Sequence, residues 1–137
     1  MADIMTEGPT TVTETTSIGD AMGVMSDEGV RHLPVVRGSD VVGMLSDRDV
    51  GKLGVSLFSD VEGYEQMKAK IAQPVSIMMT GGVVTVDQDS DVSEAVDLML
   101  DEKLGALCVV ESGTSSLVGI VSYVDVLKAA RDALDSL

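Results

Sequence analysis

The sequence predicts an α+β fold made of two copies of one β-α-β-β-α unit. The first observation behind this prediction is an internal repeat. The halves align at a shift of 74 residues (Met5 to Met79), which becomes 76 after a longer loop (Gly43 to Gly119). The second observation is that the apolar spacing changes from helical to strand-like in the same order in both copies. Matches at so many separate positions indicate a tandem duplication. The aligned pairs include Val12 with Val86, Val35-Val36 with Val109-Val110, Ser46 with Ser122 and Asp49 with Asp125.

Each copy begins with an extended segment, at residues 10–13 and 83–86, and a helix follows it. The spacing of Ser17 and Asp20, and of Asp91 and Glu94, is typical of a helix N-cap with a capping box. Apolar residues then recur at helical spacing, so each helix is predicted to bury one stripe. The stripe residues are Ile18, Ala21, Met22 and Met25 in the first copy, and Val92, Ala95, Val96 and Met99 in the second.

Two short strands come next in each copy, at 33–36 and 41–45 and at 106–110 and 117–121, separated by turn-forming residues. A periodic helix is predicted over 123–133, whereas its counterpart in the first copy breaks up through Gly51 and Gly54. We therefore divide the chain into repeat 1 (1–60), a connector (61–74) with a short helix near 61–71, and repeat 2 (75–137).

One copy of this length buries too little surface to be stable alone. We therefore expect the two copies to pack sheet to sheet about a pseudo-two-fold axis. That arrangement would put the Ser46/Asp49 and Ser122/Asp125 pairs in clefts between the halves. Each pair follows an apolar strand and stands where a helix begins, a place that can hold oxygen-rich ligands.

Composition excludes several function classes. The net charge of −14 opposes binding to nucleic acid or to an anionic membrane surface. No apolar run approaches the ~18 residues of a membrane span, and the N-terminus lacks the features of a secretory signal. A single cysteine, Cys108, suits a reducing compartment, so we expect a cytoplasmic protein. One histidine and one cysteine cannot form a zinc site. The sequence also shows no pairing of a nucleophile with a base, so we do not expect an enzyme.

The repeated motifs resemble those of the CBS domain, the regulatory module named after cystathionine β-synthase. The resemblance covers essentially the whole chain and implies a stand-alone CBS-domain pair, also called a Bateman module, with no catalytic domain. Such pairs bind AMP, ADP, ATP or S-adenosylmethionine in clefts between the copies, and they form disc-like homodimers. The motifs that carry the resemblance are Ile4-Met5-Thr6, Arg31-His32-Leu33-Pro34-Val35-Val36 and Gly43-Met44-Leu45-Ser46-Asp47-Arg48-Asp49, with Met78-Met79-Thr80, Leu107-Cys108-Val109-Val110 and Gly119-Ile120-Val121-Ser122-Tyr123-Val124-Asp125 in the second copy.

By this resemblance, Asp49 and Asp125 hold ribose hydroxyls, and Ser46 and Ser122 lie near the sugar or phosphate. A carboxylate suits this role because it accepts strong, charge-assisted hydrogen bonds from two neighbouring hydroxyls. The same Ser-x-x-Asp spacing is also that of a helix-capping box. Both interpretations, ligand binding and helix capping, therefore remain open at this point.

The resemblance also implies that the two clefts differ. The phosphate-contacting positions hold Arg31, His32 and Arg48 in the first copy, whereas the second copy has only uncharged residues there, Gly105, Ala106 and Val124. We therefore expect ribose at Asp125 with its phosphates near the three basic residues, and a weaker Asp49 cleft. The alternative is that Arg31 and Arg48 are solvated surface cations paired with local acids.

Three other residues carry lesser expectations. The only histidine, His32, would make phosphate binding depend on pH, unless it is simply a neutral histidine at a strand edge. Val12 and Val86 would flank an adenine ring, unless they belong to the core. The function expected from all this is sensing of AMP, ADP or ATP with signalling to an unknown protein target. The alternatives are a ligand-free dimerisation or interaction module and a sensor of S-adenosylmethionine or NAD.

Overall fold

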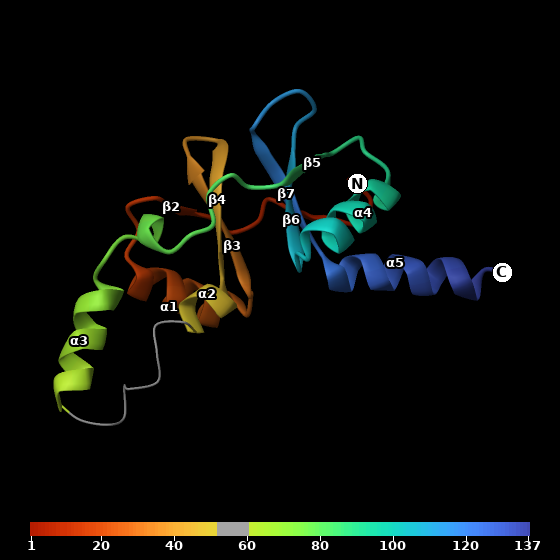
Figure 1. Cartoon of the computed structure of the whole chain (residues 1–137). Helices are drawn as coiled ribbons and strands as arrows, with labels where there is room; N and C mark the ends of the chain where they lie inside the picture. The colour runs from red at the N-terminus through yellow and green to blue at the C-terminus, as the bar shows by residue number, and fades with distance from the viewer. Residues whose placement is uncertain (52–60) are drawn as a thin grey trace. The chain divides into compact units, whose positions relative to one another are not determined.

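The computed structural model describes residues 1–51 and 61–137, with the side chains of helix α3 (Val61–Ile71) described from residue 65 (Figure 1). The predicted break at Gly54 lies outside the described residues. The chain forms two compact units. The N-terminal unit comprises Thr10–Arg37 and Val42–Gly82. The C-terminal unit comprises Met1–Pro9, Gly38–Val41 and Val83–Leu137. Mixed helices and sheets in both units confirm the predicted α+β class.

The N-terminal unit has a three-stranded sheet in the order β2-β3-β4. Strand β2 runs parallel to β3, with Val12 opposite Val35. Helix α1 packs against β3, α2 and α3. The predicted connector helix is confirmed as α3. The elements are β2 (Val12–Thr13), α1 (Ile18–Glu28), β3 (His32–Arg37), β4 (Asp40–Ser46), α2 (Asp47–Gly51), α3 (Val61–Ile71) and a 3₁₀ turn (Val75–Ile77).

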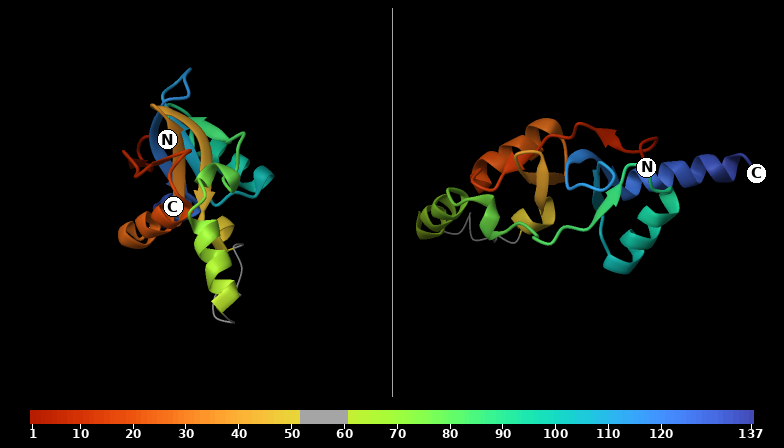
Figure 2. Two further views of the ribbon diagram at one scale, coloured as in Figure 1. Left: turned by 90° about the vertical axis from the view of Figure 1, so that its left-hand side faces the viewer. Right: turned by 90° about the horizontal axis from the view of Figure 1, so that it is seen from above.

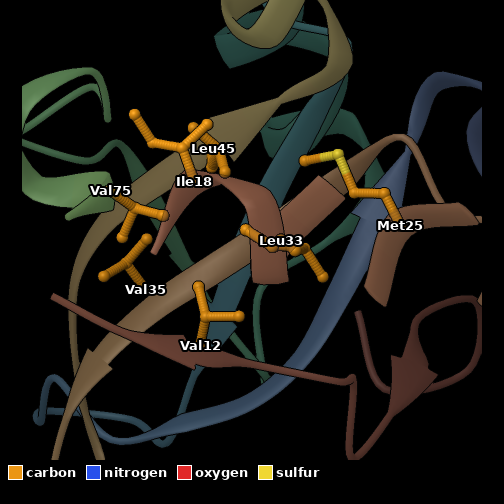
Figure 3. Close-up of a cluster of buried hydrophobic side chains, with 8 residues drawn as sticks. Val12, Ile18, Met25, Leu33, Val35, Leu45 and Val75 are labelled. Carbon is orange, nitrogen blue, oxygen red and sulfur yellow. The ribbon is translucent and has the colours of Figure 1, made fainter. Parts of the chain in front are cut away.

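The core of this unit lies between α1 and the sheet, because the apolar stripe of α1 faces β3 and β4 (Figure 3). Ile18, Ala21 and Met25 are buried as predicted, whereas Met22 is 36% exposed, so its place in the stripe was wrong. The buried residues of α1 are Ile18, Ala21 and Met25, so Met22 lies at the border of the buried stripe. The buried cluster is Val12, Ile18, Ala21, Met25, Leu33, Val35, Leu45 and Val75.

The C-terminal unit has a four-stranded sheet in the order β1-β7-β6-β5. Strand β5 is parallel to β6, and β7 is antiparallel to both β6 and β1. The elements are β1 (Thr6–Glu7), β5 (Thr85–Asp87), α4 (Val92–Glu102), β6 (Ala106–Val110), β7 (Leu117–Ser122) and α5 (Tyr123–Asp135). The buried cluster is Met1, Val86, Ala95, Met99, Leu107, Val109 and Val121.

Each compact unit takes its Met-Thr segment from the other repeat. Thr6 of the first repeat pairs with Ile120 on β7, and Thr80 of the second repeat forms a bridge with Met44 on β4. The Thr80–Met44 bridge has two backbone hydrogen bonds, of 2.9 and 3.1 Å. A tight contact on a glycine accompanies each pairing, Met5 on Gly119 and Met79 on Gly43. The compact units are therefore not continuous in sequence.

The helix caps follow the sequence only in part. The Ser17 hydroxyl accepts a hydrogen bond of 3.0 Å from the Asp20 amide, as an N-cap should. Asp91 occupies the equivalent cap position, but its side chain forms no capping bond, so the predicted side-chain cap at Asp91 was wrong. The amide of Glu94 donates instead to the backbone carbonyl of Asp91, so this amide already has a partner.

Helix α5 differs from the other long helices because none of its residues is buried. Figure 2 shows its C-terminal half extending beyond the other elements of the C-terminal unit. None of the helices in the described parts of the chain is long and apolar enough to cross a membrane.

Candidate functional site

The first candidate site forms where β4 ends and α2 begins. The backbone amide of Ser46 donates to Oδ2 of Asp49 at 3.0 Å. The amide of Asp49 donates to Oγ of Ser46 at 3.1 Å. These reciprocal bonds make a capping box, which satisfies amides that a helix start leaves without partners. Both side chains are half-buried.

The second repeat forms the same arrangement where β7 ends and α5 begins. The amide of Ser122 donates to Oδ2 of Asp125 at 2.9 Å, and the amide of Asp125 donates to Oγ of Ser122 at 3.3 Å. The Ser122 hydroxyl also lies 3.1 Å from Oδ2 of Asp125. Both contacts of the Asp125 carboxylate use Oδ2, so capping does not consume Oδ1 of Asp125.

The capping role that the sequence left open is therefore present in both copies. It does not exclude the ribose role, because an ionised carboxylate offers about four lone-pair sites on two oxygens. The assignment of ribose to Asp49 and Asp125 remains a prediction. The capping bonds fix the orientation of each carboxylate at a half-buried helix start, as a ligand site would require.

The N-terminal unit brings Arg31, His32 and Arg48 to the start of α2. The carbonyl of Arg31 accepts a hydrogen bond of 2.9 Å from the amide of Asp47, the first residue of α2. His32 opens β3 directly after it, and Arg48 stands in the first turn of α2. Arg31 and His32 therefore lie beside the first residue of α2, and Arg48 lies between Asp47 and Asp49 in that helix.

The second repeat keeps this backbone framework without the charges. The carbonyl of Gly105 accepts from the amide of Tyr123 at 2.9 Å, which reproduces the Arg31–Asp47 bond. Ala106 beside it is buried, and Val124 in the first turn of α5 is 42% exposed. The two helix starts thus share a backbone geometry and differ in chemistry. The predicted grouping of the three basic residues with Asp125 joins residues of two units and stays a prediction.

Burial lowers the pKa of His32 below its usual 6.5. The carboxylates of Asp47 and Asp49 oppose this effect, and the guanidinium of Arg31 adds to it. The imidazole is therefore mostly neutral at pH 7. Asp47 was not among the residues singled out from the sequence. The feature that could have identified Asp47 was its place as a charged residue between Ser46 and Asp49 in the motif.

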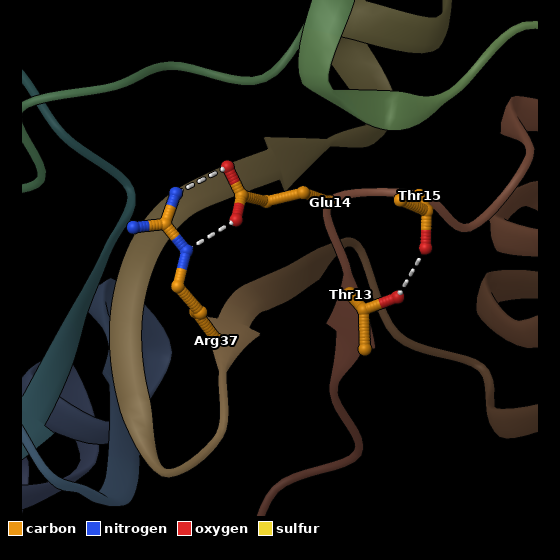
Figure 4. A network of polar contacts seen from close by, with 4 residues as sticks. All are labelled: Thr13, Glu14, Thr15 and Arg37. Carbon is orange, nitrogen blue, oxygen red and sulfur yellow. Dashed lines mark hydrogen bonds and ion pairs between the residues drawn. The ribbon is translucent and has the colours of Figure 1, made fainter.

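Arg31 and Arg48 have exposed side chains, and neither forms an ion pair with a carboxylate in the part of the chain that the structure describes. Arg37 provides the contrast (Figure 4). Its Nε and a terminal guanidinium nitrogen donate to the two oxygens of Glu14 at 2.8 and 3.0 Å. Among the described residues, pairing with a local acid is therefore found at Arg37 and not at Arg31 or Arg48, and the choice between phosphate binding and surface cations at these two arginines stays a prediction.

Val12 and Val86 lie in the two hydrophobic cores, with 6% and 2% of their surfaces exposed. They stand opposite Val35 and Val109 in parallel strand pairs, which turns their side chains toward the packed helices. They belong to the cores, which is one of the two roles that the sequence left open, and contact with an adenine ring stays a prediction.

Two further kinds of site, a reactive cysteine and a metal site, find no support in the described residues. Cys108 is fully buried in β6, and burial raises the pKa of its thiol to about 12, so it has almost no thiolate at neutral pH. Within residues 1–51 and 61–137, no group of three or more histidine, cysteine, aspartate or glutamate side chains could hold a metal ion.

Comparison with known proteins supplies the family. The CBS domain profile matches residues 1–53 and 75–132. The structure of CBSX2 in complex with AMP is similar over 96% of both chains, with 27% identity and a TM-score of 0.78. The CBS-domain containing protein ATU1752 from Agrobacterium tumefaciens is similar over 95% of this chain and 98% of that one, with 26% identity and a TM-score of 0.76.

Two curated relatives are much longer than this chain. Protein MJ1404 of Methanocaldococcus jannaschii is 31% identical over 94% of this chain, which spans 31% of that protein. The A-adding tRNA nucleotidyltransferase of Aquifex aeolicus is 29% identical over 98% of this chain, which spans only 15% of that enzyme. The similarity to both relatives therefore concerns one part of a larger protein.

Proposed function

This chain belongs to the CBS-domain family, and we propose that it is a regulatory CBS pair that binds an adenosine phosphate and signals its presence to a protein partner. The observation that carries this proposal is the grouping of Arg31, His32 and Arg48 at the start of α2, beside a capped carboxylate. In a chain with a net charge of −14, two exposed arginines without an ion-pair partner among the described residues suit a phosphate.

Two features support adenosine phosphates as the ligand class. The capped aspartates offer oriented carboxylate oxygens to the two hydroxyls of a ribose, and the arginines offer planar donors to a phosphate. The relative CBSX2, at 27% identity, has been solved in complex with AMP. AMP, ADP and ATP share these groups, whereas S-adenosylmethionine and NAD place different charges beside the ribose and are the alternatives.

The sequence expectation assigns the ribose to Asp125, and Asp49 is the other candidate. Asp49 belongs to the unit that contains the basic residues, and Asp125 belongs to the other unit. Asparagine substitutions separate the two because an amide oxygen can still accept the serine amide bond of the capping box. Asp125→Asn and Asp49→Asn therefore keep the cap and remove the charge that a ribose would meet.

Isothermal titration with AMP tests the site. Hydrogen bonds to charged groups contribute about 1.5–3 kcal/mol, so the aspartate that holds the ribose should lose roughly 10- to 100-fold in affinity as asparagine. The double variant Arg31→Gln, Arg48→Gln should lose at least as much for AMP and far less for adenosine. Arg37→Gln in the same unit is the control and should bind AMP like the wild type. Equal AMP affinity in all of these variants would refute the proposed site.

A regulatory role also separates this chain from the enzyme that it resembles in part. The nucleotidyltransferase similarity covers 15% of that enzyme, and we assign no catalytic activity to the residues described.

A thermal-shift series with AMP, ADP, ATP, S-adenosylmethionine and NAD identifies the ligand class, because a ligand that binds the native state raises Tm. Indifference to all five would favour the ligand-free interaction module. The buried free Cys108 suits the reducing cytoplasm in which we place the protein.

We further propose that the protein is a homodimer that uses helix α5. Tyr123, Leu127 and Leu134 recur at helical spacing on one face of α5, and they are 47%, 61% and 67% exposed. A second copy of the same face would bury them. Leu127→Glu should halve the mass measured by light scattering. Ile77→Glu, at a residue that is equally apolar and 59% exposed in the N-terminal unit, is the control and should leave the mass unchanged.

A further inference from the structure

Charged groups of both signs act on the imidazole of His32. The groups that act on the imidazole are the carboxylates of Asp47 and Asp49 on α2 and the guanidinium of Arg31 beside it. Arg48 adds a second guanidinium in the same first turn of α2. The acidic chain as a whole repels an approaching phosphate dianion, so a further positive charge beside Arg31 and Arg48 would favour its binding.

Protonation of His32 would add one positive charge beside the two arginines. The imidazole is half-buried, so its interaction with a nearby anion is screened less than that of a surface group. The two carboxylates already stabilise the charged form, and burial and Arg31 oppose it. A bound dianion would be a third negative group that stabilises the charged form of the imidazole.

We infer that His32 couples anion binding to proton uptake, so that the N-terminal unit binds a phosphate group more tightly as the imidazole becomes protonated. The inference rests on the proposed function, because it takes Arg31, His32 and Arg48 as the phosphate-binding residues. Linkage makes the coupling reciprocal: a proton strengthens anion binding by the same factor by which the anion strengthens proton binding.

The sign of the effect follows from the two states of the site. Without the anion the pKa of His32 lies below 6.5, so the imidazole is neutral at pH 7.5. With the anion bound the pKa rises. Affinity for the anion therefore increases as pH falls through the bound-state pKa, and it becomes constant below the free-state pKa. A rise of about one in pKa corresponds to a tenfold gain in affinity.

The single histidine gives a direct test. The imidazole C–H resonance of His32 is followed by NMR from pH 5 to 8.5 in the full chain, with no addition, with saturating AMP and with saturating adenosine. The resonance reports the pKa of His32 itself, so the second ionisation of the AMP phosphate, near pH 6, does not confuse the result. Sodium sulfate, which stays a dianion over this range, is a second probe, and sodium chloride at equal ionic strength is its control.

We expect AMP and sulfate to raise the pKa of His32 by about one, and adenosine and chloride to leave it near its free value. The sulfate effect should vanish in Arg31→Gln, Arg48→Gln and persist in Arg37→Gln. Asp47→Asn should lower the free-state pKa, because it removes a charge that favours the imidazolium.

The outcomes separate the two hypotheses. If resonances elsewhere show saturation by AMP while the pKa of His32 stays the same, the coupling is refuted and the proposed function stands. If AMP does not bind but sulfate raises the pKa of His32, the coupling stands and the adenosine assignment fails. If neither compound binds or changes the pKa, both are refuted.

Discussion

Replacing Gly43 by alanine should destabilise the protein because Met79 already occupies the space that a side chain would need. A Cβ atom on Gly43 would lie 2.5 Å from Sδ, 3.0 Å from Cγ and 3.2 Å from Cε of Met79. All three atoms belong to the end of a flexible side chain, which can move away at a cost. Overpacking costs about 1–3 kcal/mol, and this flexibility places Gly43→Ala near the lower limit.

Gly119→Ala, at the equivalent position of the second repeat, should lower the free energy of unfolding more than Gly43→Ala does. There a Cβ atom would meet Sδ of Met5 and would also lie 3.0 Å from the backbone oxygen of Thr6. Thr6 is held in the pairing of β1 with β7, opposite Ile120, so its carbonyl cannot swing away. We expect a loss of about 2 kcal/mol for Gly119→Ala, against about 1 kcal/mol for Gly43→Ala.

Gly23→Ala is the matched control. Gly23 lies inside α1, and a Cβ atom there would meet nothing within 4 Å. Alanine should therefore stabilise this helix by about 0.5–1 kcal/mol through the unfolded chain and helix propensity. The same substitution thus has opposite signs at Gly23 and Gly43, and the difference isolates the contact with Met79.

Urea denaturation followed by circular dichroism measures these differences, and a double-mutant cycle assigns the cause. Met79→Ala removes the atoms that Gly43→Ala would strike, so the cost of Gly43→Ala should largely disappear in the Met79→Ala background. The reasoning is refuted if Gly43→Ala costs the same in both backgrounds, or if it stabilises the protein as Gly23→Ala does.

Three further predictions concern stability and reactivity. Lys103 ends α4 in the left-handed conformation with φ 57°, and its repeat counterpart Gly29 ends α1 in the same conformation. Lys103→Gly should therefore raise Tm and increase the free energy of unfolding by about 1 kcal/mol, and Gly29→Lys should lower Tm. Ser17→Ala removes a capping bond and should cost about 1 kcal/mol in urea titrations, whereas Asp91→Ala, which loses no capping bond, should cost clearly less. With a pKa of about 12, Cys108 is thiolate at a fraction of about 10⁻⁴ at pH 8, so a thiol reagent should react with it only after urea is added. Rapid labelling of the native protein would contradict the last prediction.

Local patterns predicted the repeated elements because each has its own periodicity. The stripes of α1 and α4 recur at helical spacing, and the strands β3 and β6 are short apolar runs between turns. Met22 shows the limit of this reasoning. Its spacing fits the stripe, but how far the sheet extends over the helix decides which border residue is buried, and spacing carries no information on that extent.

The exchange of the Met-Thr segments was beyond local reasoning for a different reason. Strand β1 has two residues, and Thr80 pairs with Met44 through an isolated bridge, so neither segment is long enough to show an alternation. The partner of such a segment is set by tertiary packing. The signal in the sequence was indirect: a glycine in each last strand, Gly43 and Gly119, where another group approaches closely.

The duplication also decides which residues can report on a ligand. Both copies keep the capping box and the backbone bond from the first helical residue to the position before the strand, so helix formation alone accounts for Ser46, Asp49, Ser122 and Asp125. Helix formation does not account for Arg31 and Arg48. Their counterparts Gly105 and Val124 support the same backbone geometry without charge, and neither arginine pairs with a described carboxylate. Loss of AMP affinity after an aspartate is replaced by alanine would thus be ambiguous between a lost cap and a lost ligand contact, and only the asparagine variants, which keep the cap, avoid that ambiguity. Loss in the arginine variants has no such folding explanation. The case for a phosphate ligand therefore depends on the cations and not on the motif that first identified the repeat.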